Sequence, residues 1–182
     1  MRMHVKAKKM AFGGMLLALT IVCMLLGSII ETSTLFLLAA ASFFVGIVLR
    51  EFGEKTGIAF YIAGVLLGLI VAPNKFYVLS YAAMGVYILV IELAWPRLGK
   101  VPETAKRKRL FWLIKYVVFN VIYVPSVFFF QELLFARKLS TGMLIGALAV
   151  GQVGLFIYDR AYEFFQREVW NKFRGRLFRS GN

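Results

Sequence analysis

Six long hydrophobic segments follow one another along the chain and are separated by short polar or basic stretches. They cover residues 10–30, 35–49, 57–72, 76–95, 110–130 and 141–158. A helix needs about 20 apolar residues to cross the hydrocarbon core of a bilayer, and shorter segments suffice where polar residues reach the interface. The pattern therefore predicts six transmembrane helices and no soluble domain between them.

The composition argues against a water-soluble fold. Hydrophobic residues make up 60% of the 182 residues and charged residues only 17%, whereas about 25% of an average soluble domain is charged. The single cysteine, Cys23, lies within the first hydrophobic segment, and the single histidine, His4, has no carboxylate or cysteine at a ligand spacing. We therefore expect an all-α integral membrane bundle with no disulfide, no metal site and no cofactor.

Lysine and arginine are distributed unevenly between the loops. Most of the 22 lie before the first segment, after the second, between the fourth and fifth, or after the sixth. Lys115, one turn into the fifth segment, is counted on the same side. The three exceptions are Lys75, Arg137 and Lys138. Because cytoplasmic loops carry the excess of basic residues, this distribution predicts a multi-pass protein of the plasma membrane with both termini in the cytoplasm.

The end of the chain differs from the hydrophobic part. We expect a six-helix transmembrane domain over residues 1–161 and a basic, aromatic cytoplasmic tail over residues 162–182. In the tail, arginine and lysine alternate with Phe164, Phe165, Trp170, Phe173 and Phe178. This alternation is typical of an amphipathic helix on an anionic leaflet, so we expect membrane lipids and not nucleic acid as its partner.

Small residues line up on three of the predicted helices, where they allow close approach of another helix. The three stripes are Ala7, Ala11, Gly14 and Ala18; Gly57, Gly64 and Gly68; and Gly142, Gly146 and Ala149. We expect the second and third stripes to pack inside the bundle. For the first stripe, internal packing and an external docking face both remain open.

Polar side chains at the outer helix ends and within the last two segments predict a pocket that opens outward. The candidate substrate-binding residues are Glu31, Thr34, Asn74, Lys75, Tyr81, Asn120, Tyr123, Gln131 and Gln152. An uncompensated polar group in hydrocarbon costs several kcal/mol, roughly, so such residues face the bundle interior or a cavity. In the alternative interpretation, Asn120 and Gln152 bond to each other, and Glu31 and Lys75 are interfacial charges without a ligand.

The sequence offers no set of catalytic residues. It has one terminal histidine and no carboxylate cluster or phosphate-binding loop, so acid or base catalysis would depend on isolated carboxylates. Asp159 and Glu163 lie one helical turn apart among Arg160 and Arg167. We interpret them as counter-charges of a solvated helix at the cytoplasmic surface, and we expect a protein that is not an enzyme.

The start of the chain resembles the substrate-binding S-components of energy-coupling factor transporters. The resemblance is carried by the basic lead, Ala11-Phe-Gly-Gly-Met-Leu-Leu-Ala-Leu-Thr20 and the polar Glu31-Thr-Ser-Thr34, and length and span number agree over the whole chain. It implies that Ala7, Ala11, Gly14 and Ala18 form the face that docks on a coupling membrane subunit driven by two ATPases. It also implies that the loop around Glu31 to Thr34 closes over a vitamin-like solute.

A second resemblance is to uncharacterised membrane proteins of Gram-positive bacteria. These share the Gly-Gly-Met-Leu-Leu-Ala-Leu opening and a Pro-Asn-Lys turn like Pro73 to Lys75. We therefore expect a substrate-binding membrane subunit for uptake of a small organic solute, with an ATP-driven partner because the chain has no nucleotide-binding loop. The alternatives are a non-transporting scaffold of envelope assembly, similar to the rod-shape protein MreD, and a lipid-handling membrane protein.

Overall fold

The computed structural model describes residues 2–100, 104–129 and 140–174, and within them the regular structure is entirely helical. The described residues contain six helices that are long and apolar enough to cross a membrane, which confirms the predicted fold class. These helices are α1 (Arg2–Ile29), α2 (Thr34–Phe52), α3 (Glu54–Val71), α4 (Lys75–Arg97), α5 (Thr104–Phe129) and α7 (Thr141–Phe164). Two short 3-10 turns, Glu31–Ser33 and Leu98–Lys100, extend the ends of their neighbours.

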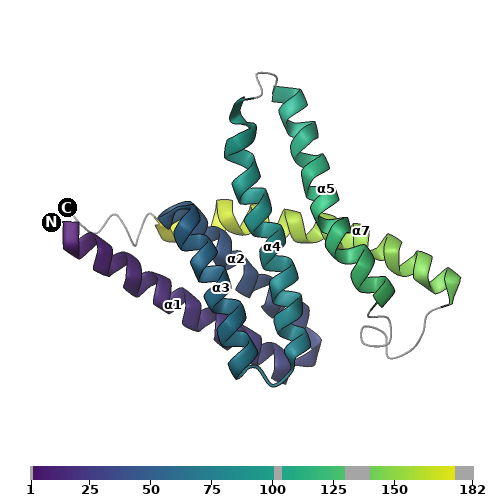
Figure 1. Cartoon of the computed structure of the whole chain (residues 1–182), viewed down its shortest axis with the longest axis horizontal. Coiled ribbons are helices and arrows are strands. Elements are labelled where there is room, and N and C mark those ends of the chain that lie inside the picture. The colour runs from purple at the N-terminus through teal and green to yellow at the C-terminus, as the bar shows by residue number, and fades with distance from the viewer. Residues whose placement is uncertain (1, 101–103, 130–139, 175–182) are drawn as a thin grey trace. The chain divides into compact units, whose positions relative to one another are not determined.

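The chain divides into two compact units, one with α1 to α4 and one with α5 and α7 (Figure 1). In the first unit α2 is the central helix and packs against α1, α3 and α4. Every residue of α2 from Ala41 to Leu49 is buried. The sequence explains this position, because a helix that is apolar all around finds its place in the interior of a bundle.

Glycines bring α3 close to its neighbours in the first unit. A Cβ atom on Gly64 would lie 2.5 Å from Oη of Tyr81, and one on Gly68 would lie 2.9 Å from Sδ of Met24. Gly57 faces Leu49 in the same way. The second small-residue stripe therefore packs internally, as predicted from the sequence.

The turn between α2 and α3 depends on Gly53. Its φ of 88° lies in the left-handed region, which glycine adopts without the clash of a Cβ atom. The backbone N–H of Gly53 also bonds to the carbonyl of Leu49 at the end of α2. The chain can therefore reverse direction with only one residue between two helices.

The third small-residue stripe does not pack internally within its own unit. A Cβ atom added to Gly142 or Gly146 would meet no atom of the described residues within 4 Å, and Ala149 is exposed. Within this unit the inner face of α7 lies on its opposite side, where Gly151 contacts the ring of Tyr123, so the third stripe does not contribute to the contact between α5 and α7. Spacing alone identifies a face of small residues but not the side on which the next helix lies.

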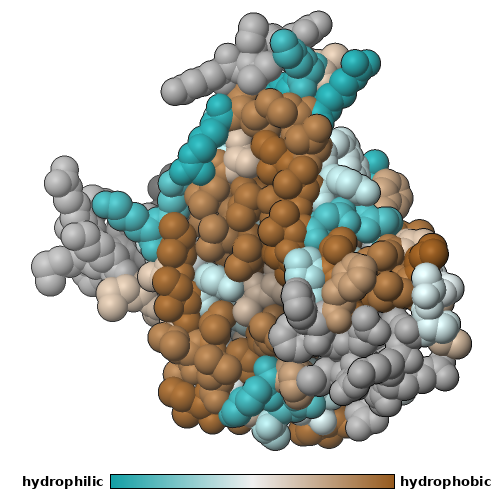
Figure 2. Space-filling model, turned by 45° about the vertical axis from the view of Figure 1, so that its right-hand side comes forward, coloured by the Kyte–Doolittle hydropathy of each residue, from teal (hydrophilic) through white to brown (hydrophobic). Residues whose placement is uncertain are grey.

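The last helix continues further than its hydrophobic segment. The predicted span ends at residue 158, but α7 runs to Phe164, and a π-helix over Phe165–Trp170 carries the helical path on to residue 174. The described part of the tail is therefore helical, as expected, and is continuous with the span. Hydrophobic residues cover most of the visible face of the described helices in Figure 2, as a bilayer environment requires.

Candidate functional site

A buried ion cluster joins α5 to α7. The ammonium of Lys115 lies 2.8 Å from a carboxylate oxygen of Asp159 and 3.0 Å from Oε1 of Glu163. The side chains of Lys115 and Asp159 are only 2% and 0% exposed. Phe111 and Trp112 add their ring faces, with centroids 4.6 Å and 5.1 Å from the same nitrogen. The ammonium of Lys115 is therefore paired with two carboxylates and is removed from water.

The cluster changes from buried to exposed along α7. Asp159 is completely enclosed, whereas the side chain of Glu163, one turn further along, is half exposed. Glu163 is also within 3.5 Å of Arg160, so its carboxylate is shared between the buried lysine and an exposed arginine. Residues one helical turn apart point to the same side of a helix, which is why both carboxylates reach one ammonium.

The structure corrects one interpretation of the sequence. Asp159 is not a solvated counter-charge, because it is enclosed and paired with Lys115, which is equally enclosed. The sequence does contain an indication of this contact, because Lys115 lies within the fifth hydrophobic segment. A charge inside such a segment needs a partner on a facing helix, and Asp159 is the acidic residue at the end of the sixth segment.

Two further polar contacts follow the ion cluster along the same pair of helices. Asn120 and Gln152 exchange amide hydrogen bonds of 3.3 Å and 3.0 Å, which confirms the interpretation that they bond to each other. The hydroxyl of Tyr123 donates to the carbonyl of Ala147 at 2.7 Å. The order of the contacts, 115 with 159, 120 with 152 and 123 with 147, makes α5 and α7 an antiparallel hairpin joined by polar groups.

A double-mutant cycle should detect the amide pair. We expect Asn120→Ala and Gln152→Ala to be coupled by about 0.6 kcal/mol, and by no more than about 1.7 kcal/mol, the range of hydrogen bonds between membrane helices. The free energy of unfolding in mixed micelles would be measured for both single variants and the double variant. Tyr123→Phe with Gln152→Ala is the matched control, because these two residues have different partners, and its coupling should be close to zero.

In the first unit, the predicted pocket residues mainly close helix ends. Thr34 donates its hydroxyl to the carbonyl of Gly27 at 2.7 Å. Asn74 caps α4 by accepting the N–H of Phe76 at 3.0 Å, and the ammonium of Lys75 donates to the carbonyl of Ala72 at 2.9 Å. These contacts satisfy backbone groups that helix ends leave open.

Tyr81 differs from the other described pocket residues, because its hydroxyl has no hydrogen-bond partner among the described residues. Its side chain is fully buried, and its hydroxyl is one of three buried polar side-chain atoms without a hydrogen-bond partner in the described part of the chain. The neighbouring Tyr61, by contrast, donates to the carbonyl of Ala82 at 3.0 Å. A buried hydroxyl without a partner is costly, so it marks the place where a polar atom of a ligand or a water molecule would be stabilised.

The remaining candidates cannot be joined to these contacts. The side chain of Glu31 and the whole of Gln131 lie outside the described residues. Thr34, Asn74, Lys75 and Tyr81 belong to the first unit, whereas Asn120, Tyr123 and Gln152 belong to the second. The outward-facing pocket composed of all nine therefore stays a prediction.

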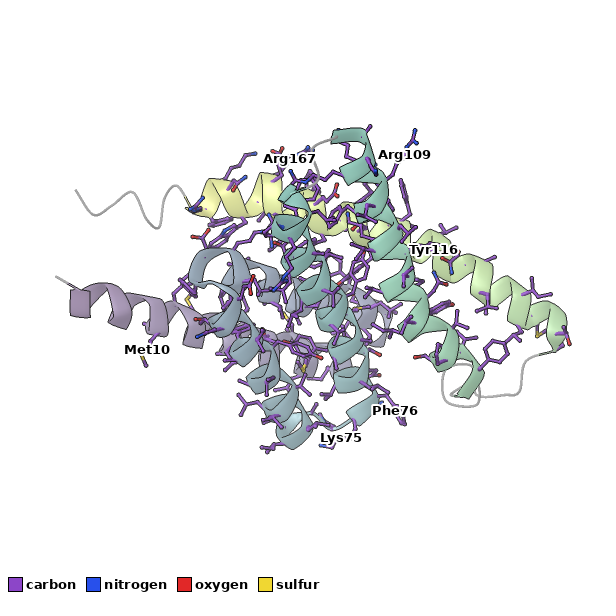
Figure 3. The ribbon with its side chains drawn as sticks, turned by 45° about the horizontal axis from the view of Figure 1, so that its top comes forward. Met10, Lys75, Phe76, Arg109, Tyr116 and Arg167 are labelled. Atoms are coloured by element: carbon purple, nitrogen blue, oxygen red, sulfur yellow. The ribbon has the colours of Figure 1, made fainter. Side chains whose placement is uncertain are left out.

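The first small-residue stripe lies on the outer surface of α1 within its unit. Ala11, Gly14 and Ala18 are exposed, and a Cβ atom on Gly14 would meet nothing within 4 Å among the residues that the structure describes. Ala7 is also on α1, but its side chain lies outside the described residues. Met10, next to the stripe, projects away from the neighbouring helices in Figure 3.

The described residues contain no group of three or more histidine, cysteine, aspartate or glutamate side chains placed to hold a metal ion. No family model matches the chain, and neither a curated protein nor a solved structure does.

Proposed function

We propose that this protein is a substrate-binding membrane subunit for uptake of a small, vitamin-like organic solute, and that it works with an ATP-driven partner. The observation that carries the proposal is the exposure of Ala11, Gly14 and Ala18 on α1. A face of small residues lets the backbone of another helix approach closely. Such a face on the outside of the unit is suited to docking a coupling membrane subunit.

The distribution of side-chain size along α1 supports this proposal. Its inner face holds Leu16 and Met24, which are buried in the first unit. Along the line of the stripe its side chains are small from Ala11 to Ala18 and bulky further along, where Val22 and Ile29 are exposed. Met15 and Leu19, which are also exposed, lie beside this line. Lipid chains pack against bulky and small residues alike, whereas a partner helix gains contact area where side chains are small.

The solute-binding part of the proposal is supported by Tyr81. Its enclosed hydroxyl faces Gly64 of α3, and the ring of Tyr61 lies beside the Tyr81 ring, with the two centroids 6.3 Å apart. Small-molecule sites combine apolar walls with a few polar groups that fix orientation. We further propose that the plasma membrane holds the protein with both termini in the cytoplasm, since the positive-inside rule places the Lys108 and Arg109 end of α5 there.

Replacing Gly14 with leucine tests the docking face. We expect the melting temperature of the isolated protein to stay within 1–2 °C, roughly, because a small surface change alters stability little. We expect co-purification from native membranes of a membrane subunit together with ATPases to be lost, because one bulky side chain blocks close helix approach. Val22→Leu, further along the same face, is the matched control and should retain the partner.

Native mass spectrometry of the gently purified protein separates the alternative functions. A retained organic solute of vitamin size supports uptake, whereas a retained phospholipid that Tyr81→Phe releases supports a lipid-handling protein. A chain that carries neither, and that co-purifies with envelope-assembly proteins in place of ATPases, would be a scaffold. A large loss of stability in Gly14→Leu with an intact complex would contradict the docking face.

A further inference from the structure

The helical continuation of α7 has two distinct faces. Its exposed face is formed by residues that follow one another in steps of four and three, namely Arg160, Phe164, Arg167, Asn171 and Arg174. Its buried face carries Tyr162, Gln166 and Trp170. We call the exposed set the arginine stripe, because its three arginines are all exposed and recur every seven residues along the helical path.

The π-helix accounts for the alignment of the buried face. Tyr162, Gln166 and Trp170 are each four residues apart, and a turn of α-helix contains 3.6 residues, so this spacing would drift around an α-helix. The π-turn over Phe165–Trp170 is wider and keeps the three side chains on one line. Gln166 donates to the hydroxyl of Tyr162 at 3.3 Å along that line. The arginine stripe is thereby held on the outer side.

The outer side of this segment keeps a positive charge. Its acidic residues are Glu163, which lies 3.5 Å from Arg160, and Glu168, which lies 3.6 Å from Arg167 and 3.5 Å from Lys172. These ion pairs are exposed and therefore weak. Asp159 is occupied by Lys115 inside the hairpin, so the exposed basic residues outnumber the exposed acidic ones.

Aromatic rings accompany the arginines. Phe164 lies on the stripe and is exposed, and Phe173 is exposed near its end. The guanidinium of Arg160 lies 5.3 Å from the centroid of the Phe156 ring, one turn back into the hydrophobic segment. Apolar rings beside basic groups are typical of helices at the boundary between hydrocarbon and headgroups. Arg167 of this segment is labelled in Figure 3.

We propose that the arginine stripe binds the phosphate groups of anionic phospholipids in the headgroup layer next to the end of the sixth span. Guanidinium groups pair with phosphate oxygens in a two-pronged geometry. The hydrophobic segment ends at Tyr158, so Arg160 lies at the boundary. Seven residues rise about 10 Å along a helix, and the headgroup layer is about 5–8 Å thick. Arg160 therefore lies within the layer, whereas the backbone of Arg167 lies about 2–5 Å beyond it and its long side chain reaches back to the phosphates. Arg174 is one further step away and contributes less.

The test uses the full-length protein extracted from nanodiscs that contain equal amounts of phosphatidylglycerol and phosphatidylcholine. Native mass spectrometry would compare the two lipids retained. We expect the wild-type protein to prefer phosphatidylglycerol and expect Arg160→Gln and Arg167→Gln each to reduce that preference roughly fivefold, since a basic residue near an anionic surface is worth about 1 kcal/mol. Arg174→Gln should have a smaller effect.

Two controls keep the outcome interpretable. Lys172→Gln removes the same charge from a different side of the helix and should change the preference less than the two arginine variants. Arg160→Lys with Arg167→Lys keeps the charge and should retain most of the preference even if Arg160→Gln disturbs Glu163. Equal retention of both lipids by the wild-type protein, or an equal loss in Lys172→Gln, would overturn the proposal. Neither result depends on whether the protein binds a solute.

Discussion

Replacement of Lys115 with methionine should destabilise the α5–α7 hairpin by about 3–5 kcal/mol, the cost of leaving one member of a buried ion pair without its partner. Methionine has nearly the length of lysine, so the packing against Phe111 and Trp112 is kept and the charge alone is removed. Asp159, which is completely enclosed, would then lose the ammonium that lies 2.8 Å from its carboxylate. The free energy of unfolding, measured in mixed micelles, would give the size of the loss.

Two further variants separate the charge effect from packing. Lys115→Met combined with Asp159→Leu should recover most of the lost stability, because apolar residues that replace both partners of a buried ion pair are often as stable as the pair. Glu163→Gln should cost about 1 kcal/mol or less, because its side chain is half exposed. If Lys115→Met were as stable as the wild type, the ammonium would not be holding Asp159 in the folded protein.

Replacement of Gly64 with alanine should destabilise the first unit by about 1–3 kcal/mol, the usual range for overpacking a core. The added Cβ would lie 2.5 Å from Oη of Tyr81 and 3.2 Å from the ring carbon that bears it. Tyr81 is fully buried and cannot swing into open space. Thermal unfolding in detergent would report the loss as a lower melting temperature.

Removal of the hydroxyl should rescue this variant. Tyr81→Phe takes away the closest atom, so Gly64→Ala combined with Tyr81→Phe should be more stable than Gly64→Ala alone. Tyr81→Phe by itself should cost little or even stabilise, because the hydroxyl has no hydrogen-bond partner among the described residues. Gly14→Ala is the matched control, since its Cβ would meet no described atom within 4 Å. A Gly64→Ala variant as stable as Gly14→Ala would contradict the close contact between α3 and Tyr81.

The six spans could be predicted because a helix that crosses a bilayer must be a continuous stretch of apolar residues in the sequence. Each helix must be apolar over a fixed length, and that length can be read without knowing any neighbour. The internal position of Gly57, Gly64 and Gly68 was also predicted, because a face of glycine allows another helix to approach closely. The same pattern at Gly142 and Gly146 meets no neighbour among the described residues, so the pattern alone does not decide. The end of the last helix could not be predicted in this way. Hydropathy shows only where the apolar residues end, and α7 continues beyond that point.

The contacts of the candidate site depend on which helix faces meet, and this information is not local. Lys115 and Asp159 are 44 residues apart, and Asp159 has two charged neighbours, Arg160 and Glu163, that suggest a solvated surface. The amide pair of Asn120 and Gln152 was among the interpretations of the sequence, because both lie deep within their segments. A pocket that combines both units would require their arrangement, which neither spacing nor composition determines.

The separation of Lys115 from its carboxylates also has a consequence for biosynthesis. Asp159 is synthesised 44 residues after Lys115, and at about 5–20 residues per second this takes roughly 2–9 s. During that interval α5 enters the bilayer with an ammonium that has no counter-ion, so its long side chain must extend toward the headgroups. α5 can settle at its final depth only when α7 arrives, which makes the two helices a single unit of membrane insertion.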